Sequence, residues 1–164
     1  MKRFLTLLAV ILFAGAAAMA QTQKLISFKA MGITDDMPIF GMSGATSLYH
    51  KITPEYEVNG SKLVLYIEPS QALIREKSFI NIFIGTKPVY SGRLTKDSIQ
   101  RIGLAISRAD VSADHFLKLQ IKTALTISDD KCRDLDNPAM WIKVKNYSYV
   151  SLTKSTKNFL TTYI

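Results

Sequence analysis

The amino-acid sequence predicts an all-β protein, an antiparallel two-sheet sandwich of the jelly-roll type that follows a cleaved signal peptide. Apolar and polar residues alternate along most of the chain, and β-branched and aromatic residues are plentiful in the alternating segments. Turn residues separate these segments at spacings of about ten residues, which is typical of sandwiches. No internal repeat or linker divides the chain, so we expect one domain over residues 21–164.

Residues 1–20 carry the three parts of a signal peptide. Lys2 and Arg3 supply a basic start, residues 4–13 are predominantly apolar, and Ala-Met-Ala at residues 18–20 matches a signal-peptidase site. The apolar run is shorter than the roughly 20 residues that a spanning helix needs, which disfavours an uncleaved anchor. We therefore expect cleavage after Ala20 and a periplasmic mature chain.

The chain is moderately basic, with 21 Lys and Arg against 13 Asp and Glu and a formal net charge of +8. The basic residues are spread along the sequence instead of forming a run, so we expect no nucleic-acid partner. Solvated strand faces or an acidic surface partner account for the charge more simply. The single cysteine, Cys132, lies far from the N-terminus and has no second thiol to pair with. An apolar core must therefore hold the fold.

Six segments alternate with the period of a β-strand. They are residues 24–29, 62–68, 78–84, 116–123, 141–145 and 147–152. The first is expected to turn Leu25 and Phe28 inward. Three further triplets are predicted to fill the core, namely Leu63, Leu65 and Ile67; Ile80, Ile82 and Ile84; and Leu117, Leu119 and Ile121. On the other side of the last segment, lysine and glutamine residues form a solvent-exposed face.

Turn chemistry lies between these segments at Asn59-Gly60-Ser61, at Pro69-Ser70, at residues 85–88 and at Ser91-Gly92. Residues 97–106 allow two interpretations. A short helix would be capped by Asp97 or Ser98, whereas the alternation of Ile102, Leu104 and Ile106 favours a strand. We interpret this segment as a strand.

Catalytic signatures are missing from the sequence. His50 and His115 are isolated, and no G-x-S-x-G elbow, H-E-x-x-H motif or phosphate loop occurs. A glycosidase would need two carboxylates at a set separation, and nothing in the sequence sets one. A hydrolase that uses Asp129 or Asp134 is therefore a distant alternative, and we expect neither an enzyme nor a cofactor.

An acidic segment is the one feature that suggests a metal site. Its oxygen-bearing side chains are Asp129, Asp130, Asp134, Asp136 and Asn137. Calcium takes six to eight such oxygens, but Lys131 and Arg133 interrupt the segment and no glycine supplies a sharp turn. A solvated turn between two strands is the favoured interpretation, and we predict no metal site.

Aromatic side chains near the C-terminus are the candidate ligand contacts, because the C–H faces of sugar rings pack on flat aromatic rings. Tyr147 and Tyr149 are expected to share a strand face and are the better sugar-binding candidates. Trp141 is a third candidate, although a place in the core is favoured for it, since sandwiches bury large aromatics.

Three stretches of the sequence resemble one known family. They are Gly41-Met42-Ser43-Gly44, the strand pair SQALIREKSFINIFIGTKPVYSGRL at residues 70–94, and DKCRDLDNPAMWIKVKNYSYVSL at residues 130–152. Their order and spacing are similar to the first domain of the periplasmic regulatory subunits of bacterial cellulose synthase. The resemblance covers about residues 25–152, nearly the whole mature chain.

This resemblance implies a periplasmic, non-catalytic domain with a carbohydrate-binding-like jelly roll. Its partners would be a membrane-embedded glycosyltransferase subunit, which makes the polymer, and the emerging β-glucan. The family often carries a cyclic-di-GMP label, but a chain behind a signal peptide does not meet a cytosolic dinucleotide. Family members are longer and end in a transmembrane helix, so we expect either a fragment or a free-standing module. The alternative function is a secreted sandwich for protein–protein interaction or adhesion, without sugar affinity.

Overall fold

The computed structural model describes residues 23–95, 98–135 and 137–155. The predicted signal peptide, residues 1–20, lies outside the described residues. Among the residues that are described, no helix has the length and apolar character needed to cross a membrane.

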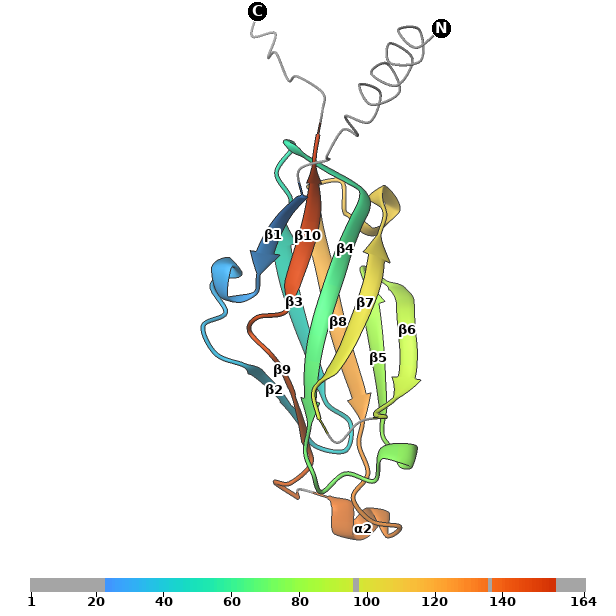
Figure 1. The fold of residues 1–164 in the computed structure, drawn as a ribbon. Helices are drawn as coiled ribbons and strands as arrows, with labels where there is room; N and C mark the ends of the chain where they lie inside the picture. The colour runs from blue at the N-terminus through green and yellow to red at the C-terminus, as the bar shows by residue number, and fades with distance from the viewer. Residues whose placement is uncertain (1–22, 96–97, 136, 156–164) are drawn as a thin grey trace, which may run out of the picture.

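Ten strands and a few short helical turns make up the described chain (Figure 1). The strands are β1 Gln23–Ser27, β2 Met37–Phe40, β3 Ala45–Lys51, β4 Tyr56–Pro69, β5 Phe79–Ile84, β6 Lys87–Arg93, β7 Gln100–Ile106, β8 Phe116–Ala124, β9 Trp141–Val144 and β10 Tyr149–Lys154. The helical turns are η1 Lys29–Met31, η2 Arg75–Lys77, η3 Arg108–Asp110 and α2 Lys131–Asp134.

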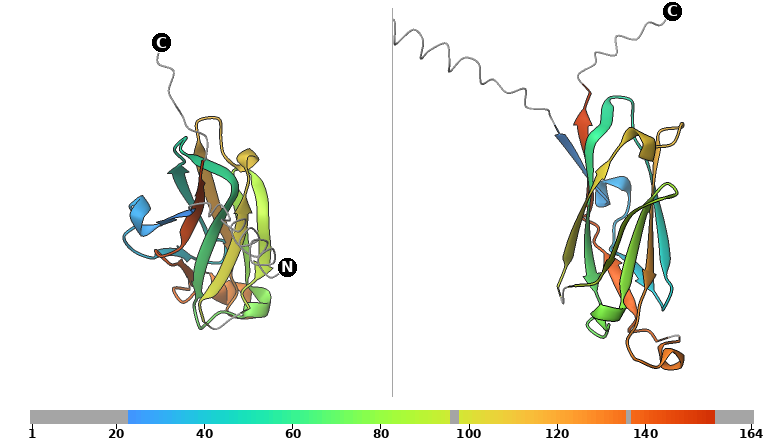
Figure 2. Two further views of the ribbon diagram at one scale, coloured as in Figure 1. Left: turned by 45° about the horizontal axis from the view of Figure 1, so that its top comes forward. Right: turned by 90° about the vertical axis from the view of Figure 1, so that its right-hand side faces the viewer.

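The strands form two antiparallel sheets that face each other (Figures 1 and 2). One has the order β1-β10-β4-β9-β2, with β7 on the other side of β4, and the second has the order β3-β8-β5-β6. Because β4 pairs with β10 along its first part and with β9 along its last, β9 and β10 occupy the same position in the strand order, one after the other. In the same way β1 and β2 together occupy the position next to them. Each sheet is therefore four strands wide, as in a jelly roll.

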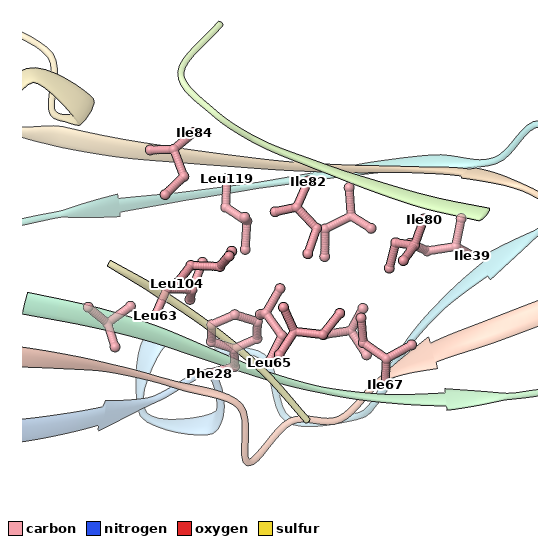
Figure 3. Close-up of a cluster of buried hydrophobic side chains, with 14 of the residues drawn as sticks. Phe28, Ile39, Leu63, Leu65, Ile67, Ile80, Ile82, Ile84, Leu104 and Leu119 are labelled. Carbon is pink, nitrogen blue, oxygen red and sulfur yellow. The ribbon is translucent and has the colours of Figure 1, made fainter. Parts of the chain in front are cut away.

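The core lies between the sheets and is built by alternation on each strand (Figure 3). Leu63, Leu65 and Ile67 of β4 are exposed by 1% or less and face Ile80 and Ile82 of β5. The three predicted inward triplets are all buried. Each fully buried aliphatic side chain stabilises the fold by about 1.5–3 kcal/mol relative to an exposed one. The apolar core that the sequence requires is therefore present.

Two of the predicted turns are parts of strands instead. Asn59-Gly60-Ser61 lies within β4, where the register against β10 shifts between Ser151 and Thr153. Gly60 has φ +82°, so glycine here permits a β-bulge and does not end the strand. Ser91-Gly92 likewise lies inside β6. Residues that favour turns indicate an irregular backbone conformation, and a β-bulge can provide that conformation as well as a hairpin turn can.

The strand interpretation of residues 97–106 is confirmed for residues 100–106, which form β7 at the edge beside β4, while Asp97 lies outside the described residues. The inward orientation expected for Leu25 is wrong. Leu25 is 62% exposed, whereas its neighbour Ile26 packs against the core and Phe28 is fully buried. The single-residue shift follows from pairing with β10, which places Leu25 opposite Ser151 and Ile26 opposite the buried Val150.

Candidate functional site

The outer face of the β4 sheet gathers aromatic side chains, and we call it the aromatic face. Tyr66 lies between Leu65 and Ile67, which are both fully buried, so the pleat turns Tyr66 outward. Val64, its outward neighbour, is 3% exposed yet lies outside the core cluster, which indicates that other side chains cover it on this face. The aromatic residues of the face are Phe40, Tyr66, Trp141, Tyr147 and Tyr149.

Tyr66 contacts the ring of Tyr147 and lies, with Tyr149, beside Arg101. The ring centroids of Tyr66 and Tyr147 lie 4.9 Å apart with the rings tilted by 54°. Arg101 of β7 is paired directly with Tyr66 in the sheet. Side-chain hydrogen bonds with Tyr149 and then with Tyr66 raise the pKa of Arg101, and its guanidinium is the donor. The tyrosines thereby present ring faces beside a fixed cationic donor.

A turn at residues 145–148 brings Tyr147 into this cluster. The Lys145 amide donates to the Tyr66 carbonyl at 2.9 Å, and the Ser148 amide donates to the Lys145 carbonyl at 2.9 Å. The hydroxyl oxygen of Ser148, a fully buried residue, accepts from the Tyr66 amide at 3.0 Å. The predicted strand 147–152 therefore begins only at Tyr149, and Tyr147 lies in the turn before it. The turn instead places Tyr147 beside Tyr66.

Trp141 lies on the same face but not in the core. It is partly exposed, pairs with the 59% exposed Phe40 of β2, and has the Lys143 Nζ atom 4.8 Å from its ring centroid. The favoured core position for Trp141 is therefore wrong. The row of Glu68 and Lys143 separates Trp141 from Tyr66. Two such steps of two residues each span about 13 Å along a strand, so the face has two aromatic groups instead of one.

One lysine on the aromatic face is held by two carboxylates. The Lys145 Nζ atom binds Glu68 Oε2 at 3.0 Å and also pairs with Asp36. The hydrogen bonds to Asp36 and Glu68 raise the pKa of Lys145. Partial burial alone would raise the pKa of Asp36, but the hydrogen bonds from Lys145 and the Asn146 amide outweigh it and lower this pKa. Lys145 is thereby neutralised, whereas Lys143 and Arg101 on the same face form no ion pair with a carboxylate among the described residues.

The carboxylates of the acidic segment stabilise the loop before β9 by hydrogen bonds. Asp134 is 2% exposed and accepts hydrogen bonds from the Ile127 amide, the Ser128 amide and the Ser128 hydroxyl. Asp130 accepts from the Cys132 amide at 3.0 Å. The turn is therefore partly buried and not fully solvated as predicted. Its buried carboxylate accepts hydrogen bonds from backbone amides, as a buried polar group requires. Across the described ranges, no group of three or more His, Cys, Asp or Glu could hold a metal ion; Asp136 lies outside them.

The two histidines lie apart from this face. His50 of β3 is half-buried, and burial lowers its pKa. His115 precedes β8 in a left-handed conformation, with φ 64° and Nδ1 3.4 Å from Arg108. Neither residue lies in the tyrosine cluster or beside Trp141.

Sequence reasoning missed Phe40 and Arg101 and did not select Tyr66. The alternation of residues 62–68 already placed Tyr66 on the face opposite the core, so its signal was present. Arg101 also lies at an outward position of β7, between two inward residues. Phe40 belongs to a strand of four residues, which is too short for periodicity to reveal.

Comparison with solved structures gives weak matches. The chain is 6% identical to the CBM36-1 domain of a multidomain xylanase from the hindgut metagenome of Trinervitermes trinervoides, with a TM-score of 0.41 and coverage of 83% of this chain and 100% of that one. It is 17% identical to the carbohydrate-binding module CBM36 in complex with calcium and xylotriose, with a TM-score of 0.36 and coverage of 71% and 78%. It is 8% identical to dimeric latent PorU from Porphyromonas gingivalis, with a TM-score of 0.43 and coverage of 73% and 12%. No curated protein matches the sequence.

One family model matches the sequence, over residues 21–156, and its description is "Cellulose synthase BcsB, first CBM domain". The match covers most of the chain and includes all three stretches that carry the resemblance. A carbohydrate-binding module is a non-catalytic type of domain, which agrees with the missing catalytic signatures. The protein belongs to the family of the first carbohydrate-binding-module domain of cellulose synthase BcsB.

Proposed function

We propose that this protein is a periplasmic accessory domain of a cellulose or related exopolysaccharide synthase complex, and that it contacts the emerging β-glucan through the aromatic face. The observation that carries this proposal is the contact between the rings of Tyr66 and Tyr147, with Tyr149 and Arg101 beside Tyr66. The family match supports the class of ligand and of complex. The sequence of residues 1–20 supports export.

A glucan chain carries no charge and alternates apolar C–H faces with hydroxyl groups. Tyr66 and Tyr147 offer adjacent rings on which such a C–H face packs. Trp141, about 13 Å further along the strands, offers a second contact that only an extended chain reaches together with the first. Arg101 lies beside Tyr66 and supplies a hydrogen-bond donor for sugar hydroxyls. Glu68 lies between Tyr66 and Trp141 and supplies an acceptor.

The polymerising chemistry belongs to the proposed partner, a membrane-embedded glycosyltransferase subunit. The domain's part is to bind and orient the product as it leaves that subunit. Shallow contacts on an open sheet face suit this role, since a guide must release each segment of a chain that keeps moving. We therefore expect weak binding of short oligosaccharides and tighter binding of long ones, which engage both aromatic groups.

Calorimetric titration of the purified protein with cello-oligosaccharides, together with pull-down on amorphous cellulose, tests this proposal. Tyr147→Ala and Trp141→Ala should each weaken binding about tenfold, since a ring contact is worth about 1 kcal/mol or more. Tyr49→Ala is the matched control, because Tyr49 is an exposed tyrosine on the other sheet. Absence of binding by the wild type, or an equal loss with Tyr49→Ala, would overturn the proposal.

A second candidate function is protein–protein interaction or adhesion without sugar affinity. Leu25 and Phe40, which are 62% and 59% exposed on β1 and β2, favour it because both lie on strands at the edge of the sheet. Sedimentation should then show dimerisation that depends on protein concentration, weakens with Leu25→Ser and ignores added cello-oligosaccharide. A monomer at all concentrations would exclude self-association as the role of this edge.

A further inference from the structure

The outer face of the four-stranded sheet differs from the aromatic face in charge, and we call it the basic face. The register places Tyr49 opposite Lys118, Lys51 opposite Phe116, and Phe79 opposite Arg93, so these side chains project from the same surface. Four cations lie on it, namely Lys51, Arg93, Lys118 and Lys122. The outward positions of β3, β5, β6 and β8 in this register carry no carboxylate.

Each of the four cations lies over an aromatic ring. The distances to the ring centroid are 5.9 Å for Lys51 and Phe116, 5.4 Å for Arg93 and Phe79, 5.6 Å for Lys118 and Tyr49, and 5.1 Å for Lys122 and Phe83. Within the described part of the chain, none of these cations forms an ion pair with a carboxylate. No carboxylate of the described residues therefore neutralises their positive charge, in contrast to Lys145 on the aromatic face.

The residues of the basic face are not needed to fill the core. Ile80, Ile82 and Leu119, which alternate with them on β5 and β8, are exposed by 2% or less and fill the inside. Tyr49 is 58% exposed and Phe116 is 40% exposed. Exposed rings that alternate with unpaired cations point to a ligand that has both a stacking surface and negative charge.

A hollow of about 670 Å³ adjoins one end of the basic face. Tyr49, Phe116 and Lys118 form part of its wall, and so do Asp110 and Asp114 from the chain before β8. Those carboxylates disfavour an anion in the hollow itself. The negative groups of a ligand are therefore expected over Lys118, Lys122 and Arg93, and an uncharged part of it toward the hollow.

We propose that the basic face binds an acidic polysaccharide, a chain whose sugar rings stack on the exposed rings of Tyr49 and Phe116 while its carboxylates pair with Lys118 and Lys122. This second site is independent of the aromatic face and takes a different ligand. A membrane surface fits the face less well, because Phe79 and Phe83 are half-buried beneath their cations instead of projecting toward a bilayer.

Titration with oligogalacturonate at low salt tests the proposal. The wild type should bind, and Lys118→Gln with Lys122→Gln should weaken binding about tenfold, since each exposed ion pair contributes up to about a fivefold change. Raising the salt concentration should weaken wild-type binding. Lys143→Gln is the matched control, because Lys143 also lies over a ring but on the aromatic face. Binding of uncharged cello-oligosaccharides should stay unchanged in the double variant, which separates this site from the proposed glucan site.

Failure of the wild type to bind oligogalacturonate would overturn the inference, and so would an equal loss with Lys143→Gln. Anionic phospholipid vesicles or single-stranded oligodeoxythymidylate that capture the protein when the acidic glycan does not would overturn it too, because each would assign the face to another ligand. Phe116→Ala should weaken glycan binding without the change in salt dependence expected for the lysine variants. An unchanged affinity in Phe116→Ala would contradict the stacking part.

Discussion

The rings of Tyr66 and Tyr147 lie 4.9 Å apart, although one comes from the central strand β4 and the other from the turn between β9 and β10. This contact depends on Ser148, a buried residue that fixes the turn by accepting a hydrogen bond from the Tyr66 amide. The proposed ligand surface is thus connected to the backbone of the sheet. Changes at the turn should affect both stability and binding.

The ring contact itself should be measurable as a coupling energy. Tyr66→Leu and Tyr147→Leu, alone and combined, should show a coupling of about 0.5–1.5 kcal/mol in the free energy of unfolding, because tilted ring pairs attract beyond their buried area. Urea unfolding measures it. Tyr66→Leu combined with Tyr49→Leu, on the opposite sheet, should be additive. A coupling as large in this control pair would contradict the contact.

Ser148→Ala should destabilise the protein by about 1–3 kcal/mol, since it leaves the Tyr66 amide without its acceptor in a buried position. Urea unfolding measures the loss, and cello-oligosaccharide titration should show weaker binding because Tyr147 is no longer held. Ser91→Ala on the exposed part of β6 is the control and should change stability by less than about 0.5 kcal/mol. Equal effects of the two substitutions would show that the turn needs no hydroxyl.

Gly60→Ala should destabilise the protein by about 1–2 kcal/mol, because a Cβ atom is strained at φ +82°. Space is not limiting there, since the added atom would lie 3.9 Å from the Thr153 hydroxyl oxygen. Gly103→Ala in β7 is the matched control, with open space and no positive φ. It should be neutral or slightly stabilising. Thermal unfolding distinguishes them, and equal melting temperatures would argue against the bulge.

The stability of the loop before β9 should depend on acid pH through Asp134. Burial alone would raise the pKa of Asp134, but the hydrogen bonds from Ser128 and Ile127 lower it below the ordinary 3.8. The lowered folded pKa means that this stabilisation is complete above the unfolded value and is lost as the pH falls through the folded one. Asp134→Asn should therefore lower stability at pH 7 and flatten its fall below pH about 4.

Urea unfolding at pH 7 and at pH 3 measures this dependence. Asp114→Asn, at an exposed position in the turn before β8, is the control and should preserve the wild-type pH profile. A profile unchanged in Asp134→Asn would show that another group causes the acid sensitivity.

Alternation predicted the core residues of β4, β5 and β8 correctly. In these strands a shift of one residue would expose every apolar side chain, so the apolar pattern fixes which face is buried. It was less reliable at Leu25, in a short edge strand where the partner β10 sets the orientation. The site was harder to predict for a different reason. Tyr147 reaches Tyr66 through a turn whose hydroxyl contact joins residues distant in the chain, and no local pattern contains that relationship. Trp141 faces outward because Ile142 and Val144 take the core positions of β9, an alternation that the sequence did contain.

The alternation on β4 also bears on how this domain can change. Leu63, Leu65 and Ile67 are committed to the core, whereas Tyr66 and Glu68 on the same strand project to the opposite side. Outward residues of either sheet can therefore be exchanged one at a time with little effect on the core. Related domains can therefore change the outer surface of either sheet separately while keeping one scaffold. The same separation makes the two faces independent targets for protein engineering.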